Sequence, residues 1–319
     1  MQSPNPMLVQ AFQLLQAGRT QEGVLLIHQL AGQGDANAML TLGEMTWGGM
    51  VAQDPVRARD LFRRSALGGN PVAGVNYTNL LANGVAGERD WPEALRRLAN
   101  EAKGDAKRRA ALDLIAAMKI DDAGDPLSLP EPQMLSTQPH ALLFPRLFTA
   151  AECAYLLKAA EPGYQPSTVF DAQRRPVRDT MRTSDGSTLH WLIEDPAIHA
   201  INRRLAAISG TDAVQGEAAQ ILRYRVGQQY RPHFDFVRAS ENQRVMTALI
   251  YLNHDYKGGE TAFIRTDLKV KAKAGDVLLF HNALPDRNVD PLSEHAGMPV
   301  TSGTKFLYSR WIRERRWAP

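Results

Sequence analysis

The stretch that decides the fold of the second half of the chain is Ile221-Leu-Arg-Tyr-Arg-Val-Gly-Gln-Gln-Tyr-Arg-Pro-His-Phe-Asp235. Within it His233 and Asp235 are two residues apart, so on an extended strand both side chains point to the same face and can hold one metal ion. Such a pair needs a third ligand from elsewhere, and His295 is the best candidate. Two histidines and one carboxylate form a facial triad that leaves coordination positions open for non-haem Fe(II) oxygen chemistry.

A His-x-Asp pattern alone is weak evidence, because such a match arises easily by chance in a chain with eight histidines. The apolar neighbours of the pair strengthen the prediction, since an unpaired aspartate among them would be costly unless a metal ion compensated its charge. Lys305 follows His295 by ten residues. A buried cation at this place is suited to hold the far carboxylate of 2-oxoglutarate.

Further motifs follow in order along the chain. They are Tyr224-x-x-Gly227-x-x-Tyr230-x-x-His233-x-Asp235, Gly258-Gly-Glu-Thr261, Gly275-Asp-Val-Leu-Leu-Phe280, His295-Ala-Gly, and Lys305 with Trp311. Together they resemble the prolyl 4-hydroxylase group of Fe(II)/2-oxoglutarate dioxygenases, from about Phe144 to Trp317. The resemblance implies a double-stranded β-helix, a jelly roll whose open mouth holds Fe(II). It also implies 2-oxoglutarate and O2 as cosubstrates, with ascorbate as an optional addition.

The resemblance assigns roles to single residues. The implied metal ligands are His233, Asp235 and His295. The residues implied to bind 2-oxoglutarate are Lys305, Tyr224, Tyr251 and Thr261. The residues implied to line the substrate side are Tyr230, Arg244 and Trp311. No catalytic residue is expected beyond the metal ligands. A buried tyrosine hydroxyl can equally bond to the backbone, so for the tyrosines both interpretations stay open.

Two further features bear on the substrate. Lysine rather than arginine at position 305 favours the prolyl hydroxylase group over the nucleic-acid demethylases of the same superfamily. The segment 174–188 is rich in Arg, Ser and Asp and resembles the mobile lid that the family folds over its substrate.

Composition limits the class of protein. A length of 319 residues suggests about two domains, and an apolar fraction of 44% is ample for packed cores. The net charge of +3 argues against a nucleic-acid partner. The single Cys153 excludes internal disulfides and fits a reducing compartment. The N-terminus lacks a secretory signal and no long apolar run is present, so we expect a cytoplasmic, soluble protein without a membrane partner.

The first part of the chain repeats itself. Gly34-Asp35, Gly69-Asn70 and Gly104-Asp105 recur every 35 residues, each placing a helix-ending glycine before an N-capping residue. Asp54-Pro55 and Asp90-Trp-Pro92 begin further helices between them. Two helices per unit at this period indicate an α-helical solenoid, and the pattern resembles Sel1-type repeats, which are related to the tetratricopeptide repeat.

Stacked helix pairs present a concave surface that suits a peptide or protein partner. The residues that could line this surface are Trp47, Asn76, Tyr77 and Asn79. The alternative is that the apolar residues at helical spacing simply form the stacking core.

Residues 121–140 contain four prolines without a periodic pattern and indicate a semi-rigid linker. Beyond it, Thr149 and Glu152 predict a capping box that opens a helix to about Ala160, and Asp195-Pro196 predicts a helix that ends at Gly210. Strands are expected at 219–226, 245–252, 261–265, 277–281 and 305–312. We therefore expect a multidomain chain: an all-α Sel1-like repeat domain at 1–120, a proline-rich linker at 121–140, and an α+β jelly-roll dioxygenase domain at 141–319.

Three functions are compatible with this organisation. The leading one is a prolyl 4-hydroxylase-like dioxygenase whose helical repeats recruit a peptide or protein. A second is hydroxylation of a free amino acid or small metabolite. A third, of another class, is a repeat scaffold that carries an inactive oxygenase domain, against which the intact ligand set and Lys305 argue.

Overall fold

The computed structural model describes residues 5–170 and 176–317. Backbone contacts divide the chain into two compact units. Unit 1 runs to Ile115 and also includes Trp191–Ala197, while unit 2 comprises Ala116–His190 and the chain from Ile198 onward. The sequence pattern placed a single boundary near residue 120 and gave no sign that a short later segment joins the first unit. Within the described ranges, no helix is both long and apolar enough to cross a membrane.

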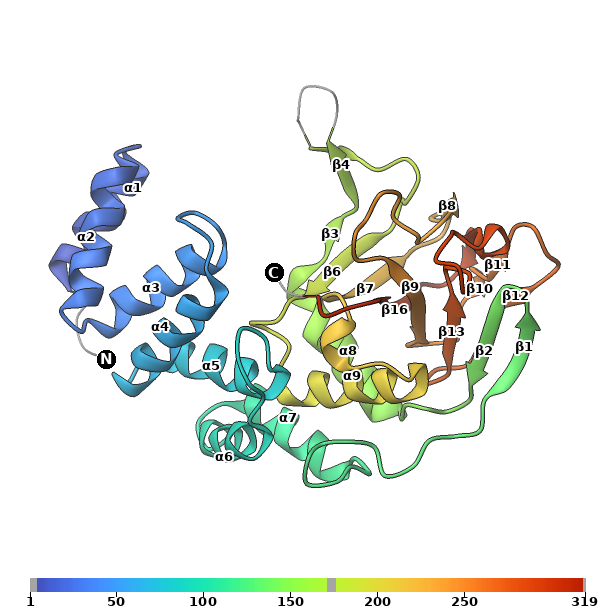
Figure 1. Ribbon diagram of the computed structural model, residues 1–319, viewed down its shortest axis with the longest axis horizontal. Helices are drawn as coiled ribbons and strands as arrows, with labels where there is room; N and C mark the ends of the chain where they lie inside the picture. Colours follow the sequence, from blue (N-terminus) through green and yellow to red (C-terminus); the bar gives the residue numbers. More distant parts are fainter. Residues whose placement is uncertain (1–4, 171–175, 318–319) are drawn as a thin grey trace. The chain divides into compact units, whose positions relative to one another are not determined.

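Unit 1 consists of paired helices (Figure 1). They are α1 (Pro6–Gln16), α2 (Thr20–Gly32), α3 (Ala36–Trp47), α4 (Pro55–Leu67), α5 (Pro71–Asn83), α6 (Trp91–Glu101) and α7 (Ala106–Ala117). The Asp35 and Asn70 side chains cap α3 and α5, and Gly34 and Gly69 before them have positive φ angles of 94° and 88°. Glycine adopts such angles without strain, so the repeated dipeptide sets where each unit begins. The predicted helical repeats are confirmed.

The segment 191–197 packs on the helices of unit 1. Trp191 and Leu192 contact the apolar cluster built around Phe62 and Leu80. The Asn79 and Asn83 side chains donate hydrogen bonds to the carbonyls of Leu192 and Trp191, at 2.8 and 2.9 Å. Side-chain amides on α5 thus hold the backbone of a segment more than a hundred residues away in sequence.

Unit 2 is a β-sandwich with helices on one side (Figure 1). The order of the large antiparallel sheet is β1 (Gln133–Thr137), β2 (His140–Phe144), β13 (Val277–His281), β9 (Arg244–Tyr251), β16 (Lys305–Arg313), β7 (Ala219–Tyr224), β6 (Asp185–Leu189) and β3 (Gln165–Pro166). The order of the smaller sheet is β12 (Lys269–Val270), β11 (Thr261–Phe263), β14 (His295–Gly297) and β8 (Tyr230–His233). Two-stranded pairs complete it: β10 (Lys257–Gly258) with β15 (Val300–Ser302), and β4 (Thr168–Phe170) with β5 (Pro176–Arg178). The predicted α+β jelly roll is confirmed.

Unit 2 has two apolar cores, because the side chains along its strands point alternately to the two faces of the large sheet. The helices α8 (Ala150–Ala160) and α9 (Pro196–Ser209) pack on the outer face of the large sheet, where Ile250 and Tyr308 lie. Leu249 and Tyr251 point the other way, into the cluster between the two sheets. Because successive side chains of a strand point to opposite faces, the same strands build the scaffold with one face and the cavity with the other.

The predicted linker differs from the structure in its second half. Gln133–Thr137 forms the edge strand β1, which pairs with β2 in antiparallel register. Prolines lack the N–H that a ladder needs, and Pro132 and Pro139 stand on either side of this short strand. Their number concealed the strand in the sequence.

Candidate active site

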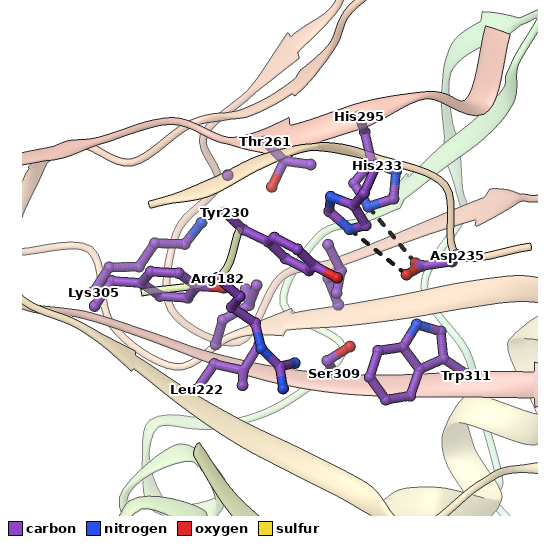
Figure 2. A pocket seen from close by; sticks show the side chains of 14 residues that line it. Arg182, Leu222, Tyr230, His233, Asp235, Thr261, His295, Lys305, Ser309 and Trp311 are labelled. Carbon is purple, nitrogen blue, oxygen red and sulfur yellow. Dashed lines mark ion pairs between the residues drawn. The ribbon is translucent and has the colours of Figure 1, made fainter. Parts of the chain in front are cut away.

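The structure brings together the three residues predicted to bind a metal ion. His233 ends β8 and His295 begins β14, and the two are direct partners in the antiparallel register. Asp235 lies in a bend two residues beyond the end of β8, not on the strand as the sequence suggested. One ligand atom of each residue lies within 4.8 Å of the others (Figure 2).

The tautomers of both histidines are set by the backbone. His233 Nδ1 lies 2.8 Å from the Arg231 carbonyl, and His295 Nδ1 lies 2.9 Å from the Ser293 carbonyl. Because a carbonyl only accepts, each Nδ1 carries a proton, which leaves Nε2 as the nitrogen that can offer a lone pair to a metal ion. The Nε2 atoms lie 3.7 and 3.6 Å from the Asp235 carboxylate, too far for hydrogen bonds. This donor set fits a divalent metal ion.

Electrostatics favour the ligand protonation states. Burial by itself would raise the pKa of Asp235, but the two histidines and the Thr247 hydroxyl outweigh it and lower the pKa. Burial and the neighbouring His295 lower the pKa of His233. At neutral pH Asp235 is therefore a carboxylate and His233 a neutral imidazole, the forms that coordinate metal ions.

Lys305 lies in the same cavity as the cluster. Its side chain is 2% exposed, and its ammonium donates one hydrogen bond, at 2.7 Å, to the Gly259 carbonyl. Burial lowers the pKa of Lys305 to about 8, although Glu260 opposes this shift. Within the described residues Lys305 forms no ion pair, so an anionic ligand would satisfy a buried cation.

The three residues whose hydroxyl groups were predicted to orient the cosubstrate, Tyr224, Tyr251 and Thr261, lie near Lys305, but only two of them line the cavity. Tyr224 is the register partner of Lys305, and it lines the cavity together with Thr261. The Tyr251 ring lies behind the cavity wall, and its hydroxyl bonds to Thr261 Oγ1 at 3.1 Å and to the Val270 carbonyl at 3.3 Å. Tyr251 therefore supports Thr261 and does not itself line the cavity.

One side of the cavity is aromatic. The ring of Tyr230 stacks on His233 with centroids 3.5 Å apart, and Trp311 faces it across the site (Figure 2). The Arg182 guanidinium lies 5.6 Å from the Tyr230 ring centroid and bonds to Ser167 and Gln220. These residues line one cavity together with the metal cluster and Lys305.

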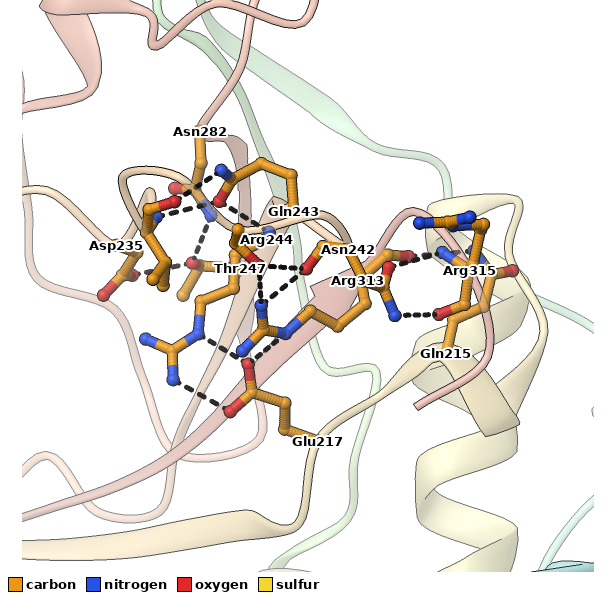
Figure 3. A network of polar contacts seen from close by, with 12 residues as sticks. Gln215, Glu217, Asp235, Asn242, Gln243, Arg244, Thr247, Asn282, Arg313 and Arg315 are labelled. Carbon is orange, nitrogen blue, oxygen red and sulfur yellow. Dashed lines mark hydrogen bonds and ion pairs between the residues drawn. The ribbon is translucent and has the colours of Figure 1, made fainter. Parts of the chain in front are cut away.

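Arg244 does not line the cavity, which differs from the predicted substrate contact. Both arms of its guanidinium bond to the Glu217 carboxylate, and its plane lies 4.0 Å from the Trp311 ring centroid. Arg313 forms an ion pair with the same carboxylate (Figure 3). Arg244 thus acts as a support for Trp311, because two hydrogen bonds to Glu217 hold its guanidinium against the indole ring.

Of the predicted lid, Arg174 and Arg175 lie outside the described residues. Pro176–Arg178 forms β5 and pairs with β4, and Arg182 reaches the cavity.

Other cavity residues were missed by sequence reasoning. The strand β16 presents Lys305, Leu307, Ser309 and Trp311 to the cavity at every second position. This period was a usable signal once Lys305 and Trp311 had been chosen. Thr247 and Asn282, which lie behind Asp235, gave no signal, since neither belongs to a quoted motif.

Comparisons with known proteins agree on one family. The model of the 2OG-Fe(II) oxygenase superfamily matches residues 219–313. Prolyl 4-hydroxylase 1 of Arabidopsis thaliana is 36% identical over 205 residues, which cover 58% of this chain and 72% of the plant protein.

Two solved structures resemble separate parts of the chain. Viral collagen prolyl hydroxylase from Paramecium Bursaria Chlorella virus-1, in its 2OG complex, is 27% identical and covers 54% of this chain and 95% of its own, with a TM-score of 0.45. A Sel1 repeat protein from Oxalobacter formigenes is 21% identical and covers 34% of this chain and 85% of its own, with a TM-score of 0.32. Both TM-scores lie below 0.5, and only the sequence similarity bears on the family.

Proposed function

Because the chain belongs to the prolyl 4-hydroxylase family of Fe(II)- and 2-oxoglutarate-dependent oxygenases, we propose that it hydroxylates prolyl residues of a peptide or protein. As a member of this family it is a 2-oxoglutarate-dependent dioxygenase, so the alternative of an inactive oxygenase domain is set aside. One observation carries the proposal. A His-Asp-His cluster, in which Asp235 and His295 are buried, shares one cavity with a buried lysine that forms no ion pair among the described residues.

His233, Asp235 and His295 would hold the Fe(II), and Lys305 the far carboxylate of 2-oxoglutarate. When bound, the metal with its cosubstrates supplies the oxidation: 2-oxoglutarate and O2 become succinate and CO2, and one oxygen atom enters a substrate C–H bond. The chain itself fixes the ligand geometry, anchors the cosubstrate and excludes water from the buried side. Ascorbate would serve as a reductant between turnovers.

The substrate would enter at the aromatic side of the cavity. The faces of Tyr230 and Trp311 offer flat apolar surfaces against which a pyrrolidine ring can pack, as in other aromatic sites for proline-rich peptides. Arg182 lies at the same side and can donate to a peptide carbonyl from N–H groups not used by Ser167 and Gln220.

We also propose that unit 1 recruits the macromolecular substrate. Of the residues expected on its concave surface, Trp47 and Tyr77 belong to the cluster that Trp191 and Leu192 contact, and Asn79 bonds to the Leu192 carbonyl. A partner would therefore meet other parts of the repeats, such as α1, where Met7, Val9 and Phe12 are exposed.

Mass spectrometry tests the proposed substrate class. The purified full chain is supplied with Fe(II), 2-oxoglutarate and ascorbate, together with proline-containing peptides, the same peptides with alanine for proline, or free amino acids. We expect succinate release coupled to the gain of one oxygen atom on proline in peptides only. Coupled oxidation of a free amino acid would contradict the proposal and favour the small-metabolite alternative. Coupled oxidation of the alanine peptides would show that another residue than proline is hydroxylated.

A further inference from the structure

A buried hydrogen-bond chain ends on the Asp235 carboxylate (Figure 3). Asn282 Nδ2 donates to Thr247 Oγ1 at 2.9 Å, and Thr247 Oγ1 donates to Asp235 Oδ2 at 2.7 Å. We propose that Thr247 and Asn282 are positioning residues, which hold the carboxylate in the orientation that binds the metal ion. The inference rests on the proposed role of Asp235 as a metal ligand.

The direction of the chain is fixed by chemistry. A hydroxyl has one proton, and the amide nitrogen of Asn282 can only donate, so Thr247 Oγ1 must accept from it. The proton of Thr247 is then donated to Asp235 Oδ2, which lies 2.7 Å away. Asn282 thus selects the rotation of the Thr247 hydroxyl that serves the ligand.

The two positioning residues lie on rigid backbone, whereas the ligand does not. Thr247 lies inside β9 and pairs in register with Phe280 and Trp311 on the neighbouring strands. Asn282 follows β13, its N–H donating to the Val245 carbonyl and its carbonyl accepting from the Asp290 N–H. Asp235 lies in a bend beyond β8. Of the three ligands it has the least support from its own strand, and it gains that support from the large sheet.

The cost of this arrangement argues for a role beyond stability. Asn282 is fully buried, and its Oδ1 has no hydrogen-bond partner among the described residues. A buried, half-satisfied amide is unfavourable compared with an apolar side chain of similar size. Its presence behind a ligand is explained if the single bond to Thr247 is what the site needs. Partners of this kind typically change metal affinity when removed.

Metal affinity of the full chain tests the proposal without relying on turnover. Mn(II) replaces Fe(II), and its dissociation constant is measured by titration with electron paramagnetic resonance. We expect Thr247→Val to raise this constant about 10- to 100-fold and Thr247→Ser, which keeps the hydroxyl, to stay near the wild-type value. Thr46→Val is the matched control, because Thr46 is equally buried in α3 and its hydroxyl donates to the Leu42 carbonyl, away from the metal cluster.

Asn282→Ala provides a second route if Thr247→Val does not fold. We expect weaker Mn(II) binding, and no additional loss in the double variant with Thr247→Val, since both residues act through one hydrogen bond. Unchanged Mn(II) binding in folded Thr247→Val or Asn282→Ala would overturn the positioning role. Wild-type protein that bound no Mn(II), or His295→Ala that bound it normally, would instead overturn the metal site itself.

Discussion

At the scale of single residues, the site gathers buried polar groups. A metal ion and an anionic ligand would supply the partners that these groups lack among the described residues. Asp235 and His295 are each 5% exposed. His295 Nε2 lies 3.6 Å from Asp235 Oδ2, a separation that suits a shared metal ion. Burying such groups without compensation is costly, so their arrangement makes sense only with ligands bound.

The metal ligands give the first prediction. Replacement of His233 or His295 by alanine should abolish succinate release and reduce Mn(II) binding, because two ligands cannot hold the ion in a facial geometry. Succinate assay and metal titration check it. His190→Ala is a suitable control, since His190 follows β6, away from the cavity. Normal turnover in His233→Ala would remove this residue from the ligand set.

The second prediction concerns Lys305. Lys305→Ala should weaken 2-oxoglutarate binding far more than Mn(II) binding, because it removes a charge partner and leaves the ligands in place. Loss of a desolvated charge pair costs about 2–5 kcal/mol, or roughly thirtyfold to several thousandfold in affinity. Calorimetric titration of 2-oxoglutarate into the Mn(II)-loaded variant measures it. An unchanged dissociation constant would mean that another cation, such as Arg182, holds the carboxylate.

The pKa of Lys305, about 8 by burial, gives a pH dependence. The charged form binds the cosubstrate, so affinity should be constant below pH 8 and fall by roughly tenfold for each pH unit above it. A bound carboxylate raises the same pKa, which is the reciprocal effect. Titrations of 2-oxoglutarate between pH 7 and 9.5 test the sign. Affinity that rose over this interval would contradict it.

At the scale of elements, one residue pattern serves two surfaces. The strand β16 gives Tyr308 and Ile312 to the core under the helices, and Lys305, Ser309 and Trp311 to the cavity. A one-residue shift in register would exchange the two sets, so the core that fixes the strand also fixes the site.

The helix α5 holds segment 191–197 through Asn79 and Asn83. Replacing both asparagines by alanine removes the two hydrogen bonds to this segment, each worth about 1 kcal/mol, and should loosen it. The same change removes the bonds that the two side-chain oxygens accept from Arg108 and from the Val85 N–H. We expect faster proteolytic cleavage near Trp191, with the rest of unit 1 intact. Mass spectrometry of the fragments follows the cleavage. Asn100→Ala, an exposed change on α6, serves as the control. Equal cleavage rates in both variants would show that the apolar contacts of Trp191 and Leu192 suffice.

At the scale of the whole molecule, we expect the two units to have separate roles, catalysis in unit 2 and substrate recruitment in unit 1. The cavity residues all belong to unit 2, so removal of residues 1–115 should leave 2-oxoglutarate turnover without substrate largely unchanged and raise KM for a protein substrate. A deletion that ended at residue 135 would remove part of β1, whereas a deletion that ends at residue 115 leaves this strand whole.

Two controls accompany the deletion. Circular dichroism verifies the fold of the shortened chain, and a short peptide substrate should show an unchanged KM. A protein substrate with equal KM in both chains would reassign unit 1 to another role.

The sequence by itself determined the local features: the helix caps of the repeats, the capping box at Thr149, the strand cores, and the residue types and spacings of the metal cluster and Lys305. These are set by neighbours in the chain or by motifs. Only the tertiary structure decided that Arg244 is held by Glu217, that Tyr251 supports Thr261, and that Trp191–Ala197 joins unit 1. Each of these depends on contacts between residues far apart in sequence, where several partners are chemically equal and packing alone selects one.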